Sequence, residues 1–204
     1  MNISEIYSLL IIIYILIWTA VITGALLLRR SNHFAIKSRK WILEKRIQQF
    51  KYPPFNILIK FWIRKRYLLT SSFFMLIIIP ASVMYFVLGI LLLTPLISIY
   101  QGFVAGILIG SYCKKDMLWA VIVGIFEFGY WALSGALGLS VTLKYIFTDI
   151  SFLASLLFCF DKLLTFYWIP LAICVLINAF GETAGPIYLN IHGPLSLEEL
   201  AGGK

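Results

Sequence analysis

The sequence is poor in charged side chains. They make up 13% of its 204 residues, whereas a soluble domain carries about 25%. Hydrophobic residues reach 61%, and a larger core cannot explain this excess because a chain of this length still needs a solvated surface. The shortage of charge therefore excludes an ordinary soluble domain and predicts a polytopic membrane protein.

Histidine and cysteine are also scarce, and the sequence has no His-Glu-x-x-His zinc motif and no phosphate-binding glycine loop. The two histidines, His33 and His192, lie outside the apolar runs, and we expect both to be solvated. The three cysteines have neither metal-ligand nor redox spacing, which favours small buried hydrophobic side chains: Cys113, Cys159 and Cys174. We therefore expect no enzyme activity, no metal and no cofactor.

Long apolar runs predict the membrane spans, because a transmembrane helix needs about 20 residues. The first run gives an N-terminal transmembrane helix within residues 1–28. The uncharged stretch 67–110 would be about 66 Å long as one helix, twice the thickness of the hydrocarbon core, so it must turn once, near Pro95. The five expected spans are 6–28, 68–92, 96–112, 117–141 and 163–189.

The predicted fold class is an all-α transmembrane helix bundle of five spans, or six, with an additional interfacial amphipathic helix. Residues 144–162 leave the number open, since they fit an interfacial helix, a re-entrant segment or a short span. Five spans place the C-terminus in the cytoplasm, and six place it outside. Residues 67–189 form the expected transmembrane core, and the polar, glycine-rich residues 190–204 form an expected mobile tail.

Positive charge is concentrated in residues 29–66, which hold 12 of the 17 Lys and Arg residues and one acidic residue. Because cationic residues flank spans on the cytoplasmic side, we expect a cell-membrane protein with its N-terminus outside and this segment cytoplasmic. Its first part is expected to lie in the interface as an amphipathic helix that ends at Pro53-Pro54. The apolar residues assigned to one face of that helix are Phe34, Trp41, Ile47 and Phe50.

Clustered Lys and Arg side chains attract anionic lipid head groups, and this is the partner that we expect first for the basic segment. A protein partner is the second alternative. Nucleic acid is the third, since phosphate contacts also need clustered cations. The side chains expected to make this contact are Arg29, Arg30, Lys37, Arg39, Lys40, Arg64, Lys65 and Arg66.

Small residues recur at helical spacing in three of the predicted spans. A spacing of four residues puts them on one face, where the missing side chains allow close helix approach. We favour helix packing, against other subunits or a second copy as well as within the chain, over a gap that admits a substrate. The glycines concerned are Gly102, Gly106, Gly110, Gly124, Gly135, Gly138, Gly181 and Gly185.

Two carboxylates, Glu127 and Glu182, lie within the apolar runs. A charged group at mid-membrane costs a few kcal/mol, so such a residue should face the bundle interior or a cavity. Three interpretations are open: the pair binds a proton or cation, hydrogen-bonds across helices, or caps a cavity that a partner fills. We favour the structural role, because no base or chain of polar residues accompanies the pair in sequence.

Residues 124–139, GIFEFGYWALSGALGL, resemble the core of the stage II sporulation protein M-like membrane family. Gly124 and Glu127 match the family's Gly and Glu, whereas Val123 and Ile122 stand where the family usually has His and Pro. The resemblance extends over residues 68–190, through the segments Gln101–Gly106 and Asn178–Thr183.

The resemblance implies a non-catalytic scaffold in a larger membrane complex, whose enzymes are other subunits. We do not carry the sporulation role over to this chain. Two alternatives stay open from the residues themselves. One is a transport or channel subunit that uses the intramembrane carboxylates for a proton or cation. The other is a membrane port of a DNA-transfer or secretion machine, with the basic segment facing the motor.

Overall fold

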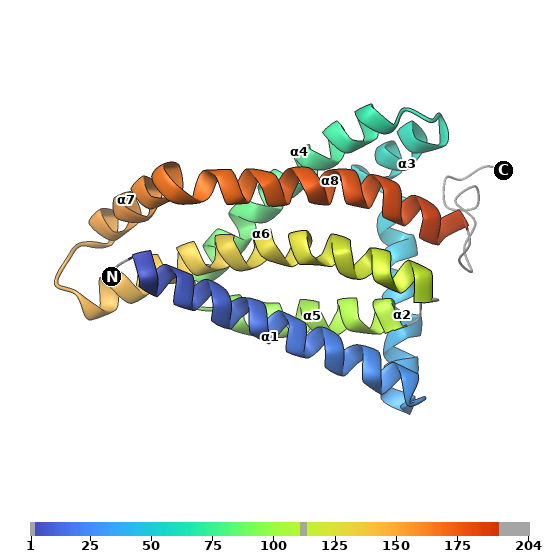
Figure 1. Cartoon of the computed structure of the whole chain (residues 1–204), viewed down its shortest axis with the longest axis horizontal. Helices are drawn as coiled ribbons and strands as arrows, with labels where there is room; N and C mark the ends of the chain where they lie inside the picture. Colours follow the sequence, from blue (N-terminus) through green and yellow to red (C-terminus); the bar gives the residue numbers. More distant parts are fainter. Residues whose placement is uncertain (1–2, 111–113, 192–204) are drawn as a thin grey trace.

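The computed structural model describes residues 3–110 and 114–191, which form helices joined by short turns, with no strand among them (Figure 1). The elements are α1 (Ile3–Arg29), α2 (His33–Phe50), α3 (Phe55–Ile63), α4 (Tyr67–Ile90), α5 (Thr94–Gly110), α6 (Lys114–Phe147), α7 (Phe152–Lys162), the π-helical turn η1 (Leu163–Tyr167) and α8 (Trp168–Ile191). The expected tail lies almost wholly outside the described residues.

Four segments are long and apolar enough to cross a membrane: Ser4–Arg29, Tyr67–Ile90, Asp116–Phe147 and Phe152–Thr183. Helix α5 is a shorter apolar helix of 17 residues. This is the architecture of a multi-pass membrane protein, as the composition predicts.

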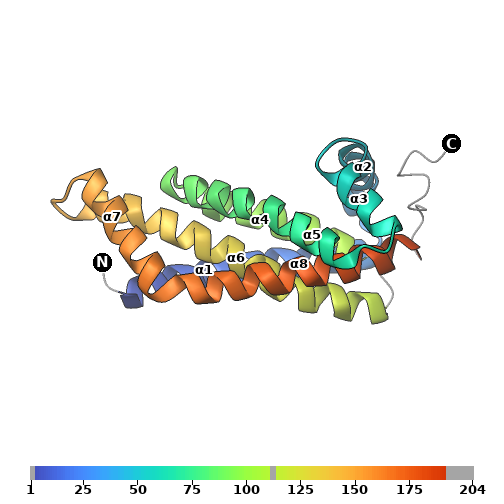
Figure 2. The same cartoon turned by 90° about the horizontal axis from the view of Figure 1, so that it is seen from above.

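The long helices run along one bundle in alternating directions, so that α1 starts and α8 ends at opposite ends (Figure 1). Helices α2 and α3 gather at one end of the bundle and α7 lies at the other, as Figure 2 shows from above. The basic segment therefore occupies a single end of the molecule, which we call the basic end.

Helices α4 and α5 form a hairpin whose turn spans residues 91–93, close to the expected position. The Leu93 N–H donates to the Leu88 carbonyl at 2.8 Å, and Leu92 takes a left-handed conformation with a φ of 59°. Pro95 follows as the second residue of α5, where its missing N–H leaves no helical bond unmade.

The ambiguous segment 144–162 is divided between two elements. Helix α6 extends to Phe147, six residues past the predicted end of that span. The Lys144 ammonium lies 3.0 Å from the centroid of the Phe158 ring, so an aromatic face of α7 accommodates the charge. Helix α7 begins after Ser151, whose hydroxyl accepts from the Ala154 N–H, and runs on through η1 into α8.

The π-helical turn η1 lies directly before Pro170. The Trp168 N–H donates to the Leu163 carbonyl, five residues earlier. In an α-helix Pro170 would leave the Phe166 carbonyl without a donor and would press its ring against it. The wider turn therefore falls where the α-helical pattern cannot be kept.

Helix α2 lies across the basic end of the bundle, transverse to the long helices (Figure 1). It docks through Ala35 and Ile42, which are buried, and Ile42 packs against Ile107 and Leu108 of α5. Because these two residues lie two helical turns apart, they form one face.

The face of α2 that docks on the bundle differs from the aromatic face that we expect in the membrane interface. Phe34 and Trp41 are exposed, at 63% and 50%, while the side chains of Ile47 and Phe50 lie outside the described part of the chain. Ala35 and Ile42 gave too weak a signal among charged neighbours to be recognised. The Phe34 ring still meets that of Phe103 on α5, with centroids 6.2 Å apart, and Trp41 is left to contact the surroundings of the protein.

The backbones of helices α1 and α5 are in direct contact. A Cβ atom added to a glycine of α5 would lie within 2.9 Å of α1 backbone atoms in three successive places: Gly102 against Ile17, Gly106 against Val21 and Gly110 against Ala25. Gly24 of α1 does the same in return, since its Cβ would lie 2.6 Å from the Phe103 carbonyl oxygen. These contacts from both helices fix the position of α5 along α1.

Helices α4 and α6 are joined in the same way. A Cβ on Gly138 would overlap the Phe86 carbonyl oxygen, and a Cβ on Gly89 would lie 2.8 Å from the Cα of Gly138. Gly135 faces a side chain instead, because a Cβ added there would lie 3.0 Å from the Thr94 Oγ1.

The remaining predicted glycines differ in what they face. Gly181 of α8 abuts the Val123 side chain of α6, whereas the three atoms nearest to a Cβ on Gly124 belong to the Phe128 ring of its own helix. Gly185 belongs to α8, but its surroundings lie outside the described part. Apart from Gly124, the predicted glycines whose neighbours are described contact other helices of the same chain, so they serve packing within the chain.

Candidate functional site

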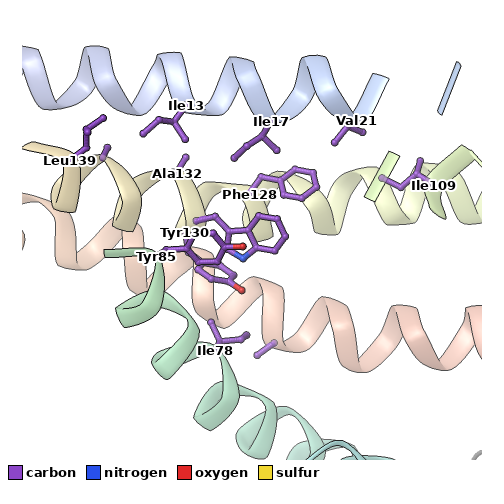
Figure 3. Close-up of a cluster of buried hydrophobic side chains, with 13 residues drawn as sticks. Ile13, Ile17, Val21, Ile78, Tyr85, Ile109, Phe128, Tyr130, Ala132 and Leu139 are labelled. Atoms are coloured by element: carbon purple, nitrogen blue, oxygen red, sulfur yellow. The ribbon is translucent and has the colours of Figure 1, made fainter. Parts of the chain in front are cut away.

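Polar side chains from α4, α6 and α8 gather inside the apolar core. Tyr85 of α4 stacks on Trp131 of α6 with ring centroids 5.1 Å apart, and Tyr130 meets the same indole edge-on at 6.1 Å. Both tyrosines are buried, and Figure 3 shows them together between α4 and α6. The O–H of tyrosine and the N–H of tryptophan usually have a hydrogen-bond partner when they are buried. This cluster therefore forms a polar region within the apolar core.

The two intramembrane carboxylates lie beside this cluster. The Tyr130 hydroxyl is within electrostatic range of both Glu127 and Glu182, and the Tyr85 hydroxyl is within range of Glu127. Both glutamates are half-buried. The structure therefore brings together, around one tyrosine, two residues that lie 55 positions apart in the sequence.

The register of α6 against α8 adds Asn178 to the cluster. A Cβ on Gly129 would lie 3.0 Å from the Cys174 Sγ, and a Cβ on Gly181 would lie 2.8 Å from the Val123 Cγ2. Because the two helices are antiparallel (Figure 1), these contacts place Asn178 within one turn of the level of Glu127. Asn178 is 1% exposed.

Two polar atoms of this cluster are buried without a hydrogen-bond partner: the Asn178 Oδ1 acceptor and the Trp131 Nε1 donor. A buried polar group left unpaired costs roughly 1–3 kcal/mol. Asn178 lies one turn before Glu182 on α8, and Trp131 lies one turn after Glu127 on α6, so each shares a helix face with a carboxylate.

Toward the basic end, a hydrogen bond ties α4 to α8. The Ser71 hydroxyl donates to the Thr183 Oγ1 at 2.8 Å, and the Thr183 hydroxyl donates to the Ala179 carbonyl at 2.7 Å. Ser71 and Thr183 are buried. Along α8, Glu182 thus lies between the hydrogen-bonded Thr183 and Asn178, whose Oδ1 has no hydrogen-bond partner.

The cations predicted to bind lipid or a partner lie at the basic end, and most are exposed. Arg39 is half-buried on the bundle-facing side of α2, and its Nε has no hydrogen-bond partner. Arg29 donates to the Met117 Sδ at 2.8 Å, which ties the end of α1 to the start of α6. The exposed members are Arg29, Arg30, Lys37, Lys40, Arg64, Lys65 and Arg66.

Within the described ranges, no group of three or more His, Cys, Asp or Glu side chains could hold a metal ion. Cys159 is buried against the Ser140 hydroxyl, with 3.0 Å between sulfur and oxygen. Cys174 is half-buried, and Cys113 lies outside the described residues.

The sequence did not single out Asn178, Tyr85 or Gly89. For Asn178 a signal existed, since an amide one helical turn before a carboxylate in an apolar run is itself unusual. Gly89 had none, because a lone glycine in a span has no repeat to mark its face.

No protein-family model matches the chain, and neither a curated protein nor a solved structure matches it. The similarity to the stage II sporulation protein M-like family stays a prediction from the residues quoted for it.

Proposed function

We propose that the chain is a non-catalytic integral membrane subunit that acts as a scaffold in a larger membrane complex. The observation that carries the proposal is the backbone-to-backbone fit of α1 with α5 and of α4 with α6. Such contacts hold helices at one distance and depth. A bundle locked in this way is suited to presenting a fixed surface, and the docked helix α2 supplies that surface with exposed cations.

The scaffold crosses the membrane five times in this proposal. The 17 residues of α5 span about 26 Å, close to the hydrocarbon thickness of about 30 Å. The opposite positions of the start of α1 and the end of α8 (Figure 1) support an odd number of crossings. The basic end is cytoplasmic and binds anionic head groups, while the exposed apolar faces contact lipid and partner subunits or a second copy. Nucleic acid is the least favoured partner.

Affinity purification from native membranes in a mild detergent tests the scaffold role. We expect another membrane protein or a peripheral enzyme to co-purify in fixed stoichiometry, as measured by quantitative mass spectrometry. Neutralising Arg64, Lys65 and Arg66 to glutamine tests whether the basic end holds that partner. A pure oligomer of this chain, with no partner at comparable amounts, contradicts the scaffold role.

Cysteine labelling of the full chain tests the orientation. In a background with its cysteines replaced by alanine, Leu91→Cys and Tyr52→Cys place single thiols at exposed positions on opposite ends of the bundle. With a membrane-impermeant maleimide on intact cells, we expect Leu91→Cys to be labelled and Tyr52→Cys to react only after lysis, because the positive residues stay inside. The reverse pattern would show an inverted topology.

A further inference from the structure

We propose that Glu127, Asn178 and Tyr130 bind a monovalent metal cation inside the bundle, between α6 and α8. The scaffold role does not require this site, and the site does not depend on the scaffold role.

The Asn178 side chain supplies the first ligand. Its Oδ1 is an acceptor without a partner on a residue that is 1% exposed. An amide oxygen in such a place needs a hydrogen-bond donor or a positive charge. Asn178 lies within one turn of the level of Glu127 across the helix interface, as the contacts of Gly129 and Gly181 require.

The charge of the surroundings favours a cation. Glu127 and Glu182 both lie within electrostatic range of the Tyr130 hydroxyl, and an ionised carboxylate in a low-dielectric environment attracts a cation strongly. A positive ion between Glu127 and Asn178 balances the carboxylate charge and satisfies the amide oxygen.

The ligand set fits a monovalent ion better than a divalent one. Carboxylate, amide and hydroxyl oxygens are hard ligands, but Ca²⁺ takes 6–8 of them, usually with several carboxylates. The described residues contain no cluster of three or more acidic side chains that could hold such an ion. A proton shared between Glu127 and Asn178 would satisfy the same oxygen, and the experiment must distinguish it from a metal ion.

Thermal unfolding of the purified full chain in detergent tests the site. The midpoint is measured by tryptophan fluorescence at constant ionic strength and pH 7.5 in NaCl, in KCl and in choline chloride. We expect Na⁺ or K⁺ to raise the midpoint saturably by roughly 5 °C over choline, because a ligand that binds only the folded state stabilises it. Glu127→Gln and Asn178→Ala should abolish this rise.

Two matched variants serve as controls: Glu5→Gln, at the far end of α1, and Asn56→Ala, in α3, should keep the rise. Equilibrium dialysis of the wild-type chain with radioactive sodium and potassium needs no variant and should show about one bound ion per chain. A midpoint that is the same in all three salts, together with no retained ion, overturns the proposal. A midpoint that depends on pH and Glu127 but on no metal cation assigns the site to a proton and also overturns it.

Discussion

Gly138→Ala is expected to lower the thermal unfolding midpoint of the detergent-purified protein by roughly 5–10 °C. The added methyl group would overlap the Phe86 carbonyl oxygen and lie 3.1 Å from the Cα of Gly89. These atoms belong to the α4 backbone, which cannot rotate away as a side chain does. The two helices must therefore separate, and overpacking of this kind costs typically 1–3 kcal/mol.

The control for this effect lies in the same helix. Gly124→Ala places its methyl group 3.3 Å from the edge of the Phe128 ring, and no atom of another helix lies closer to it than 3.8 Å. A ring can shift by a few tenths of an ångström, and alanine is the better helix former by about 1 kcal/mol. We expect the midpoint of Gly124→Ala to equal or exceed that of the wild type. Equal losses in both variants would show that α6 does not approach α4 through Gly138.

Gly135→Ala is expected to destabilise the protein and to be rescued by a second change, Thr94→Ala. The new methyl group would overlap the Thr94 Cγ2 and lie 3.0 Å from its Oγ1, but 3.3 Å from its Cβ. Thr94→Ala removes the first two atoms. The change sacrifices no hydrogen bond, because the buried Oγ1 has no partner. We expect a favourable coupling of roughly 1–2 kcal/mol in a double-mutant cycle.

The contrasting pair is Gly106→Ala with Val21→Ala. A methyl group on Gly106 would meet the carbonyl oxygen, the carbonyl carbon and the Cα of Val21, the last at 2.8 Å. Truncating the valine side chain leaves all three atoms in place, so no rescue is expected. Chemical denaturation or thermal scans of the four single variants and two double variants provide the measurement. Rescue in both pairs, or in neither, would contradict the contacts described for these glycines.

The helical architecture could be predicted from the sequence because the thickness of the membrane sets the length of each apolar run. The spacing of Gly102, Gly106 and Gly110 likewise marked one face before any partner helix was known. Gly24, which completes the α1–α5 contact, carries no such periodicity. It is recognisable only once α5 is placed beside it, since close approach is a property of the pair of helices.

The meeting of Glu127 and Tyr130 with Glu182 could not be predicted for a related reason. It depends on the register of α6 against α8, which is set where Gly181 meets Val123 and Gly129 meets Cys174. Local periodicity gives the face on which a residue lies but not its level along a neighbouring helix. The same limit applies to Asn178, whose level beside Glu127 follows from that register.

The π-helical turn before Pro170 sets the rotational phase of the last long helix. Upstream of Pro170, Tyr167 is buried with its ring 5.4 Å from that of Tyr7; downstream, Asn178 is buried against the core. The i→i+5 hydrogen bond of η1 encloses one residue more than an α-helical turn does, so deleting one residue from η1 would restore ordinary winding and leave both flanks facing as they do. Winding the same residues as an α-helix would instead rotate α8 by about 100° relative to α7, and Asn178 would turn away from the core. The length of this short segment and its wider winding therefore have to change together.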